Sequence, residues 1–107
     1  MRYAILLAPG AVRELCALPA YHRAQVRDAI ERHLRHEPTK LSKSRIKRLR
    51  GLSRPQYRLR VDDTRVFYDV TDTAVEILAI VSKSQADAWL EEQGQADPGG
   101  PAGESEG

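Results

Sequence analysis

Three strand-type segments follow one another between residues 56 and 81, and only short turn-type segments separate them. Residues 56–61 alternate apolar and polar side chains, as a half-buried strand does, and residues 65–70 are rich in strand-favouring side chains. Residues 74–81 (AVEILAIV) are almost entirely apolar, which indicates a strand that is buried on both faces. Because such short turns join neighbouring antiparallel strands, this region predicts a meander whose last strand needs cover on two sides.

Two helices are expected before the meander. Pro9 suits the first turn of a helix that runs to Pro19. Residues 20–37 repeat apolar side chains at helical spacing and carry charged side chains on the opposite face, and Pro38 ends the pattern. The tight connection at Pro19 predicts a helical hairpin. A short apolar run over residues 3–7 precedes the hairpin and favours a strand.

A third helix is expected over residues 82–92, where Ala86, Trp89 and Leu90 recur at helical spacing and Ser84 is a candidate N-cap. Residues 39–55 are polar and basic without a clear period, so we interpret them as a loop. The order β-α-α-β-β-β-α predicts an α+β domain. Its antiparallel sheet of about four strands includes the first strand and carries the helical hairpin on one face.

The 107 residues fit one domain. Five of the seven glycines and two of the six prolines lie in residues 94–107, which contain no basic residue, so we expect a disordered acidic tail after a domain over residues 1–93. The apolar run near the start is far shorter than the roughly 20 residues of a membrane span and lacks the features of a signal peptide. We therefore expect a cytoplasmic protein without membrane contact.

Metal and disulfide chemistry have little support in the sequence. Cys16 is the only cysteine, which excludes an internal disulfide and a multi-cysteine zinc site. His33 and His36 are three residues apart on the second predicted helix, but no further Cys or His completes a ligand set. We therefore expect neither a metal nor a cofactor.

The positive charge of the chain is concentrated in one region. The formal net charge is only +2, but ten of the 17 basic residues lie between Lys40 and Arg65, where Asp62 and Asp63 are the only acidic residues. A concentrated positive stretch favours an anionic partner, most often nucleic acid. The alternative is a solvated basic face without a ligand.

Three arginines stand out within this region. Arg58 and Arg60 point to the same side of a strand, and Arg65 follows just after the turn. Guanidinium groups bind phosphate and stabilise charge that develops on it, so this set suits metal-free cleavage of RNA through attack of the ribose 2′-hydroxyl. The alternative is that the arginines form the polar side of a half-exposed strand. Trp89 is either a core anchor of the last helix or a platform for a nucleobase.

The segment from Ile46 to Val81 resembles toxins of bacterial type II toxin–antitoxin systems, the RelE/ParE superfamily. The most specific part is the succession Leu-Arg-Gly, Tyr-Arg-Leu-Arg-Val and Arg-Val-Phe-Tyr, with its spacing. The earlier run AVRELCALP fits as well, and the resemblance covers about residues 2–93. It implies a twisted antiparallel sheet with two N-terminal helices and one C-terminal helix.

The resemblance also implies an activity and its residues. RelE-like members are endoribonucleases that cut mRNA in the ribosomal A site, and their basic catalytic residues correspond to Arg58, Arg60, Arg65 and Lys83. A catalytic tyrosine in the last helix has no counterpart here, where Trp89 is the nearest aromatic residue. The implied RNA-binding residues, which would contact 16S rRNA and mRNA, are Lys43, Arg45, Lys47, Arg48, Arg50, Arg54 and Trp89.

The resemblance leaves two other readings open. ParE-like members share the fold, lack the nuclease residues and poison DNA gyrase; the missing tyrosine favours this branch, whereas the three arginines favour the nuclease. A relative that binds an antitoxin and has lost its toxicity is the third possibility. In each toxic case the expected partner is a cognate antitoxin that folds over the basic surface.

Overall fold

The computed structural model describes residues 1–96. The elements in chain order are β1 (Ala4–Leu7), α1 (Pro9–Ala17), α2 (Ala20–Leu34), β2 (Ile46–Arg48), β3 (Leu52–Arg54), β4 (Tyr57–Val61), β5 (Thr64–Val70), β6 (Ala74–Ser82), α3 (Lys83–Gln93) and β7 (Gln95–Ala96).

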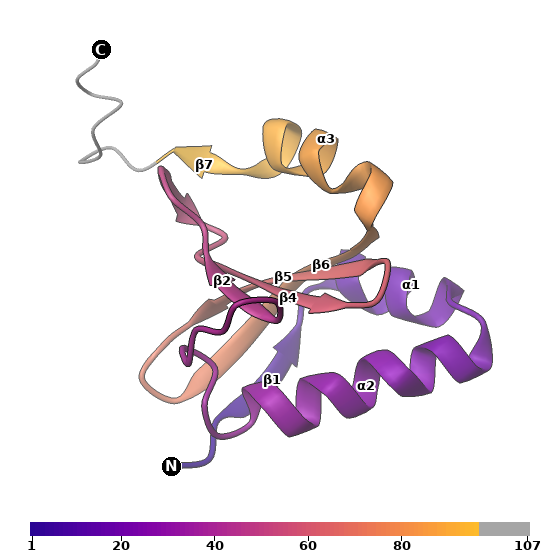
Figure 1. The fold of residues 1–107 in the computed structure, drawn as a ribbon, viewed down its shortest axis with the longest axis horizontal. Coiled ribbons are helices and arrows are strands. Elements are labelled where there is room, and N and C mark those ends of the chain that lie inside the picture. The colour runs from indigo at the N-terminus through magenta and orange to yellow at the C-terminus, as the bar shows by residue number, and fades with distance from the viewer. Residues whose placement is uncertain (97–107) are drawn as a thin grey trace.

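The main sheet lies between two helical layers (Figure 1). It has five strands in the order β1-β6-β5-β4-β2, with α1 and α2 on one face and α3 across the other. The predicted α+β class, the meander and the place of the first strand in the sheet are confirmed. The sheet has five strands instead of about four, and β1 is its one parallel member, since it pairs with β6 in that direction.

Two apolar clusters, one on each face, hold the layers together. The larger one joins the sheet to α1 and α2 and contains Tyr68, Leu59 and Leu34. The smaller one joins the sheet to α3 and contains Phe67 and Ala86, with Trp89 packed against them. The strand that is apolar on both faces, β6, contributes to both clusters, as its sequence predicts.

The turn between β4 and β5 fixes the register of the central hairpin. Val61 pairs with Thr64, so only Asp62 and Asp63 form the loop, and Thr64 already belongs to β5 instead of to the predicted turn. Asp62 has a φ of 51°, in the left-handed region that Asp tolerates better than most residues. This register places Arg60 directly opposite Arg65.

Helix α2 ends at Leu34, three residues before the predicted end. The carbonyl oxygen of Arg35 accepts a hydrogen bond from the amide of Tyr3 at 2.8 Å, and the Arg35 guanidinium donates to the Tyr3 carbonyl at 3.0 Å. Tyr3, just before β1, therefore supplies the hydrogen bond that the next turn of α2 would otherwise make to the Arg35 carbonyl. Pro38 follows and forbids further helix.

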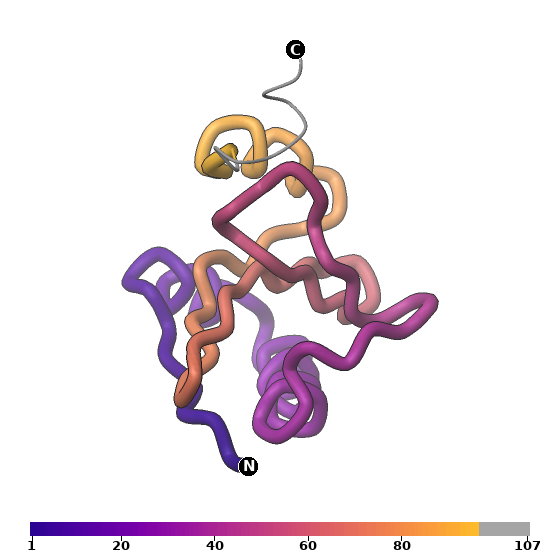
Figure 2. The backbone as a smooth tube through the Cα atoms, turned by 90° about the vertical axis from the view of Figure 1, so that its left-hand side faces the viewer, coloured from indigo at the N-terminus to yellow at the C-terminus, as the bar shows by residue number. Residues whose placement is uncertain are grey.

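The predicted loop over residues 39–55 contains two short strands, which is the main correction to the sequence prediction. β2 pairs with β4, and β3 pairs with β7 in a separate two-stranded sheet. In Figure 2 this segment (magenta) leaves the end of α2 and reaches up beside α3 before the chain returns to β4. Each strand has three residues and only one apolar side chain, so no period marks it in the sequence. The pairing with β3 includes Gln95 and Ala96, which the prediction assigned to the tail; residues 97–107 lie outside the described residues.

The end of α3 is closed by Gly94. Its amide donates to the Leu90 carbonyl at 2.8 Å, and a Cβ at this position would lie 2.5 Å from the same oxygen. Only glycine fits there without a shift of the backbone. At the other end Ser82, not the predicted Ser84, is the N-cap residue of α3.

Within residues 1–96, none of the helices has the length and apolar character that crossing a bilayer requires.

The hydroxyl of Tyr68 is expected to stabilise the fold. Tyr68 is fully buried, and its hydroxyl donates to the Pro38 carbonyl at 2.6 Å. Burial raises the pKa of this phenol well above its usual value, so the group stays a donor. Tyr68→Phe leaves that carbonyl without its donor and is expected to lower the free energy of unfolding in urea by about 1–2 kcal/mol. Tyr21→Phe, at an exposed position, is the matched control and is expected to change nothing.

Candidate nucleic-acid interface

Four basic side chains from neighbouring strands share the α3 side of the sheet. They are termed the basic face: Lys47 of β2, Arg58 and Arg60 of β4, and Arg65 of β5. Their neighbours Leu59 and Val66 belong to the cluster with α1 and α2, so the alternation of a strand sends the basic side chains to the opposite face. The register places Lys47 opposite Arg58 and Arg60 opposite Arg65.

Arg65 is the most buried member of the basic face. It is 8% exposed, and its Nη1 donates to the Asp62 carbonyl at 2.7 Å and to the Thr64 carbonyl at 3.1 Å. These bonds fasten the β4–β5 turn. Arg65 therefore contributes positive charge to the face while part of its guanidinium is committed to the main chain.

Arg58 is the member with an unused donor. Its Nε is buried and has no hydrogen-bond partner among the described residues. The pKa of Arg58 is lowered, first by burial and then by the positive charges of Arg65 and Arg60. Both conditions, an orphan N–H and repulsion between like charges, are relieved by an anion bound beside Arg58.

The basic face offers charge but no ordinary acid–base group. In the described part of the chain no carboxylate forms an ion pair with Arg58, Arg60 or Arg65. The tyrosines of the sheet, Tyr57 and Tyr68, pack on the opposite face. His22 and His33 belong to α2, which covers that opposite face, and His36 follows two residues after the end of α2. The arrangement therefore suits binding and neutralisation of phosphate groups.

Lys83 and Trp89 lie on the helix that crosses the basic face. The amide of Lys83, the first residue of α3, donates to the Asp63 carbonyl at 2.6 Å, beside the turn that Arg65 fastens. Trp89 stacks on Phe67 with ring centroids 5.2 Å apart and an interplanar angle of 9°. Since Phe67 is the partner of Arg58 in the sheet, this stack holds α3 next to the basic face and covers one side of the indole.

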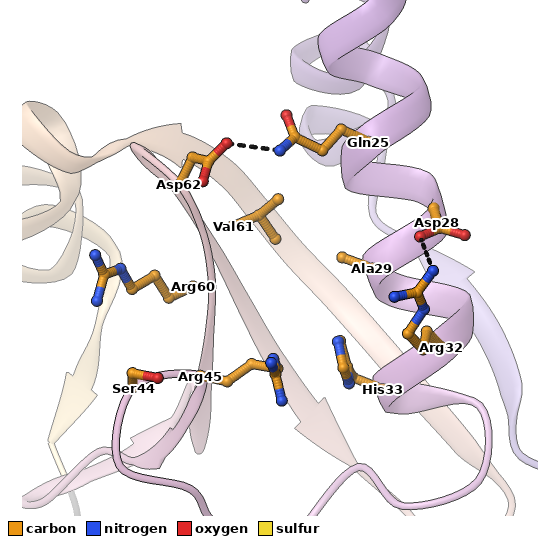
Figure 3. A pocket seen from close by; sticks show the side chains of 10 residues that line it. All are labelled: Gln25, Asp28, Ala29, Arg32, His33, Ser44, Arg45, Arg60, Val61 and Asp62. Carbon is orange, nitrogen blue, oxygen red and sulfur yellow. Dashed lines mark hydrogen bonds and ion pairs between the residues drawn. The ribbon is translucent and has the colours of Figure 1, made fainter.

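The structure separates the other residues of the predicted RNA-binding set. Lys43 and Arg50 are exposed in the connections that flank β2. Arg45 points toward α2, whereas Arg60 points the other way (Figure 3). The Nη1 of Arg48 donates to two carbonyl groups, those of Leu49 and Gln56, and its guanidinium carbon lies 5.3 Å from the centroid of the Tyr57 ring.

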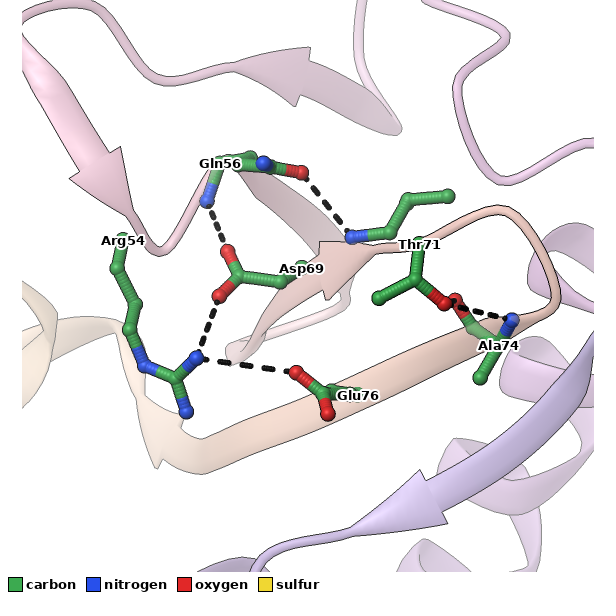
Figure 4. Close-up of polar contacts among 7 residues, drawn as sticks. Arg54, Gln56, Asp69, Thr71, Ala74 and Glu76 are labelled. Atoms are coloured by element: carbon green, nitrogen blue, oxygen red, sulfur yellow. Dashed lines mark hydrogen bonds and ion pairs between the residues drawn. The ribbon is translucent and has the colours of Figure 1, made fainter.

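Arg54 belongs to a network of polar contacts at the far end of β5 (Figure 4). Its Nη1 lies 3.1 Å from Asp69 and 3.7 Å from Glu76. Asp69 also accepts a hydrogen bond from the Gln56 amide at 2.7 Å, and the Gln56 side chain accepts one from the Val70 amide at 3.0 Å. Arg54 thus anchors the end of β3 to the main sheet.

Asp69 is a residue that the sequence does not single out. The only hint in the sequence is that Asp69 is a carboxylate inside a mostly apolar strand. This pattern does not identify Arg54 as the partner of Asp69. Asp69 is 6% exposed, and burial raises the pKa of its carboxyl, against the opposing effects of the Gln56 amide and Arg54.

The raised pKa of Asp69 predicts a pH-dependent contribution to stability. Between the unfolded and the folded pKa the folded chain holds a proton that the unfolded chain has released, so stability falls as the pH rises through this window. Asp69→Asn has no such titration and is expected to cost less stability at about pH 7 than at about pH 4. Urea unfolding at both pH values measures the difference. Asp72→Asn, in an exposed turn, is the control; an equal cost of Asp69→Asn at both pH values contradicts the prediction.

The fold is shared with chains from toxin–antitoxin complexes of known structure. A chain of the RelBE2 complex from Mycobacterium tuberculosis is 26% identical, with a TM-score of 0.61 over 77% of this chain and 99% of that one. A chain of the RelE–RelB complex from Pyrococcus horikoshii is 28% identical, with a TM-score of 0.60 over 79% and 99%. The DinJ–YafQ complex from Escherichia coli shows the same fold at 12% identity, with a TM-score of 0.62 over 78% and 96%.

Fold and sequence together define the class of this protein, a type II toxin of the RelE/ParE superfamily. The model of the family described as ParE toxin of type II toxin-antitoxin system, parDE, matches residues 5–87, and the chain belongs to this family. No curated protein matches the chain in sequence.

Proposed function

We propose that this toxin is an endoribonuclease that cuts mRNA on the ribosome. The observation that carries the proposal is the orphan Nε–H of Arg58, buried among further basic side chains of the basic face. A phosphate group of an RNA strand supplies both the acceptor and the negative charge that this position lacks. The similarity to two RelE–RelB-type complexes at 26% and 28% identity supports the same assignment.

The proposed reaction is an internal transfer at one phosphate. The 2′-oxygen bonds to the neighbouring phosphorus and loses its proton, the bond to the 5′-oxygen breaks, and that oxygen gains a proton. The products are a 2′,3′-cyclic phosphate and a 5′-hydroxyl end. Negative charge grows on the phosphorane between these states, and positioned cations lower its energy.

The residues of the basic face have distinct roles in this proposal. Arg58 and Arg60 bind the reacting phosphate, and Arg65 adds charge while it holds their strand turn in place. Arginine stays protonated at neutral pH even when its pKa is lowered, so Arg58 acts through its charge and its N–H groups. Lys83, at the start of α3, is the proposed proton donor to the 5′-oxygen.

Exposed basic side chains provide contacts to ribosomal RNA. Lys47 of the basic face, together with Lys43 and Arg50 outside it, is exposed and suits salt-dependent phosphate contacts with 16S rRNA. Arg48 is hydrogen-bonded to the Gln56 carbonyl and Arg54 is paired with Asp69. These two arginines therefore add to the positive potential of the surface but do not bind a phosphate directly. The activity belongs in the cytoplasm, where the ribosomes are.

The proposed protein partner is a cognate antitoxin. The chains to which this protein is structurally similar were solved in complexes with antitoxins. An antitoxin with acidic side chains over Arg58 and Arg60 satisfies the same orphan donor that a phosphate does.

A second candidate function is poisoning of DNA gyrase. The specific observation in its favour is that the matching family model is described as a ParE toxin. The absence of a histidine or tyrosine from the basic face within residues 1–96 agrees with it. The basic face is then a contact surface and carries no chemistry, and a non-toxic antitoxin-binding relative is the remaining alternative.

Cleavage in a cell-free translation reaction tests the nuclease. Primer extension is expected to reveal cuts within A-site codons of ribosome-bound mRNA and none in naked mRNA. Arg58→Gln and Arg60→Gln are each expected to slow cleavage by about 100-fold, as for other lost donors to a developing oxyanion. Arg13→Gln, on the exposed side of α1, removes the same charge elsewhere and is the matched control.

Two further readouts separate the alternatives. Circular dichroism checks that each variant keeps its fold. Intact mRNA together with inhibited supercoiling by purified gyrase assigns the chain to the gyrase-poison function, and loss of both effects leaves the antitoxin-binding relative. Full cleavage by Arg58→Gln contradicts the role proposed for the orphan donor.

A further inference from the structure

A second group of basic side chains lies apart from the basic face, between α2 and the segment that leads into β2 (Figure 3). It lines a cavity of about 490 Å³. Arg32 and His33 come from the last turn of α2, and Arg45 directly precedes β2. Arg60 also borders the cavity, but its side chain points away from it.

The main chain at Arg45 is held in position from two sides. The Ser42 hydroxyl accepts hydrogen bonds from the amides of Arg45 and Ile46, each at 3.0 Å. The carbonyl of Arg45 accepts one from the Arg60 amide at 2.8 Å, which joins this segment to β4. The Arg45 guanidinium then extends across the cavity toward His33.

The carboxylates that face this group already have partners. Those pairs are Asp28 with Arg32 at 2.9 Å, Glu37 with Lys40 at 3.8 Å, and Asp62 with Gln25 at 2.6 Å. Among the described residues no carboxylate lies within 4 Å of the Arg45 guanidinium or the His33 ring. The cavity thus contains a positive end that lacks a counter-ion.

Burial and the neighbouring positive charges both act on His33. Its pKa is lowered, first by burial and then by Arg45 and Arg32, with Asp28 acting in the opposite direction. The ring is therefore neutral at neutral pH. Its place in the last turn of α2 nevertheless favours the protonated form once the charge of Arg45 is balanced by an anion.

We propose that this cavity binds a single phosphate group, of a nucleotide or of an RNA strand, between Arg45, Arg32 and His33. Asp62 lies at the opposite end of the cavity and repels a second phosphate group. The size of the cavity leaves room for a sugar beside the phosphate. The site is separate from the basic face, so it stands or falls independently of the nuclease.

Binding at this site is linked to protonation of His33. The bound anion raises the pKa of His33 from its lowered value, so the complex takes up a proton that the free protein lacks. Affinity therefore rises as the pH falls through the range between the free and the bound pKa. A phosphodiester is the proper probe, because its own charge does not change in this range.

The experiment follows the His33 ring by proton NMR during titration with 2′-O-methylated UpU, a phosphodiester that cannot be cleaved, and with uridine 5′-monophosphate. His33→Gln assigns the signal among the three histidines. We expect saturable shifts, a higher His33 pKa in the complex, and about tenfold weaker binding by Arg45→Gln, as for a lost charge-assisted contact. Arg13→Gln and Arg58→Gln, outside the cavity, are expected to keep the His33 response.

The results distinguish between two sources of the phosphate group, and some of them contradict the proposal. A stronger response to the monophosphate identifies a free nucleotide or strand end as the ligand, and a stronger response to the dinucleotide identifies a strand interior. An unchanged His33 pKa, or equal affinity in Arg45→Gln, overturns the site. The same is true if Arg58→Gln abolishes the response, since the phosphate is then bound at the basic face.

Discussion

The structure depends on covering both faces of β5 and β6. Phe67 and Ala79 point to one side of these strands, and Tyr68 and Ile80 to the other, and all four are buried. Burying the apolar side chains on both faces of these two strands requires a helical layer on each face. The hairpin of α1 and α2 covers one face, and α3 covers the other. Cover is needed at the centre of the sheet and not at its β2 edge. The basic face lies on the α3 side and runs from the buried Arg65 of β5 to the exposed Lys47 of the edge strand β2.

Features that depend on the local spacing of apolar residues and on short connections could be predicted from the sequence. The apolar stretch of β6 could only be a strand with two covered faces, and the period of β4 alone predicts that Arg58 and Arg60 share one side. The brief turn then brings Arg65 opposite Arg60. Pro9 and Pro19 mark the starts of α1 and α2 correctly because proline acts on its immediate neighbours.

The sequence did not suffice where a residue's role comes from a distant partner. β2 and β3 are strands because β4 and β7 pair with them, and their own three residues carry no signal. Arg54 is indistinguishable in sequence from Arg50, yet it is bound to Asp69 fifteen residues away. His33 and Arg45 are likewise brought together only by the packing of α2 against β4.

Helix α3 is attached to the rest of the molecule at both ends, but not equally. Its start follows directly on β6, whose last residue Ser82 pairs with Thr64, and the Lys83 amide donates to the Asp63 carbonyl, whereas its end continues into the ladder between β7 and β3. Helix α3 is thus held at three places: at Lys83, along its length by the stack of Trp89 on Phe67, and at its end by the pairing of β7 with β3. Separation of β7 from β3 removes one of these attachments and leaves the other two in place.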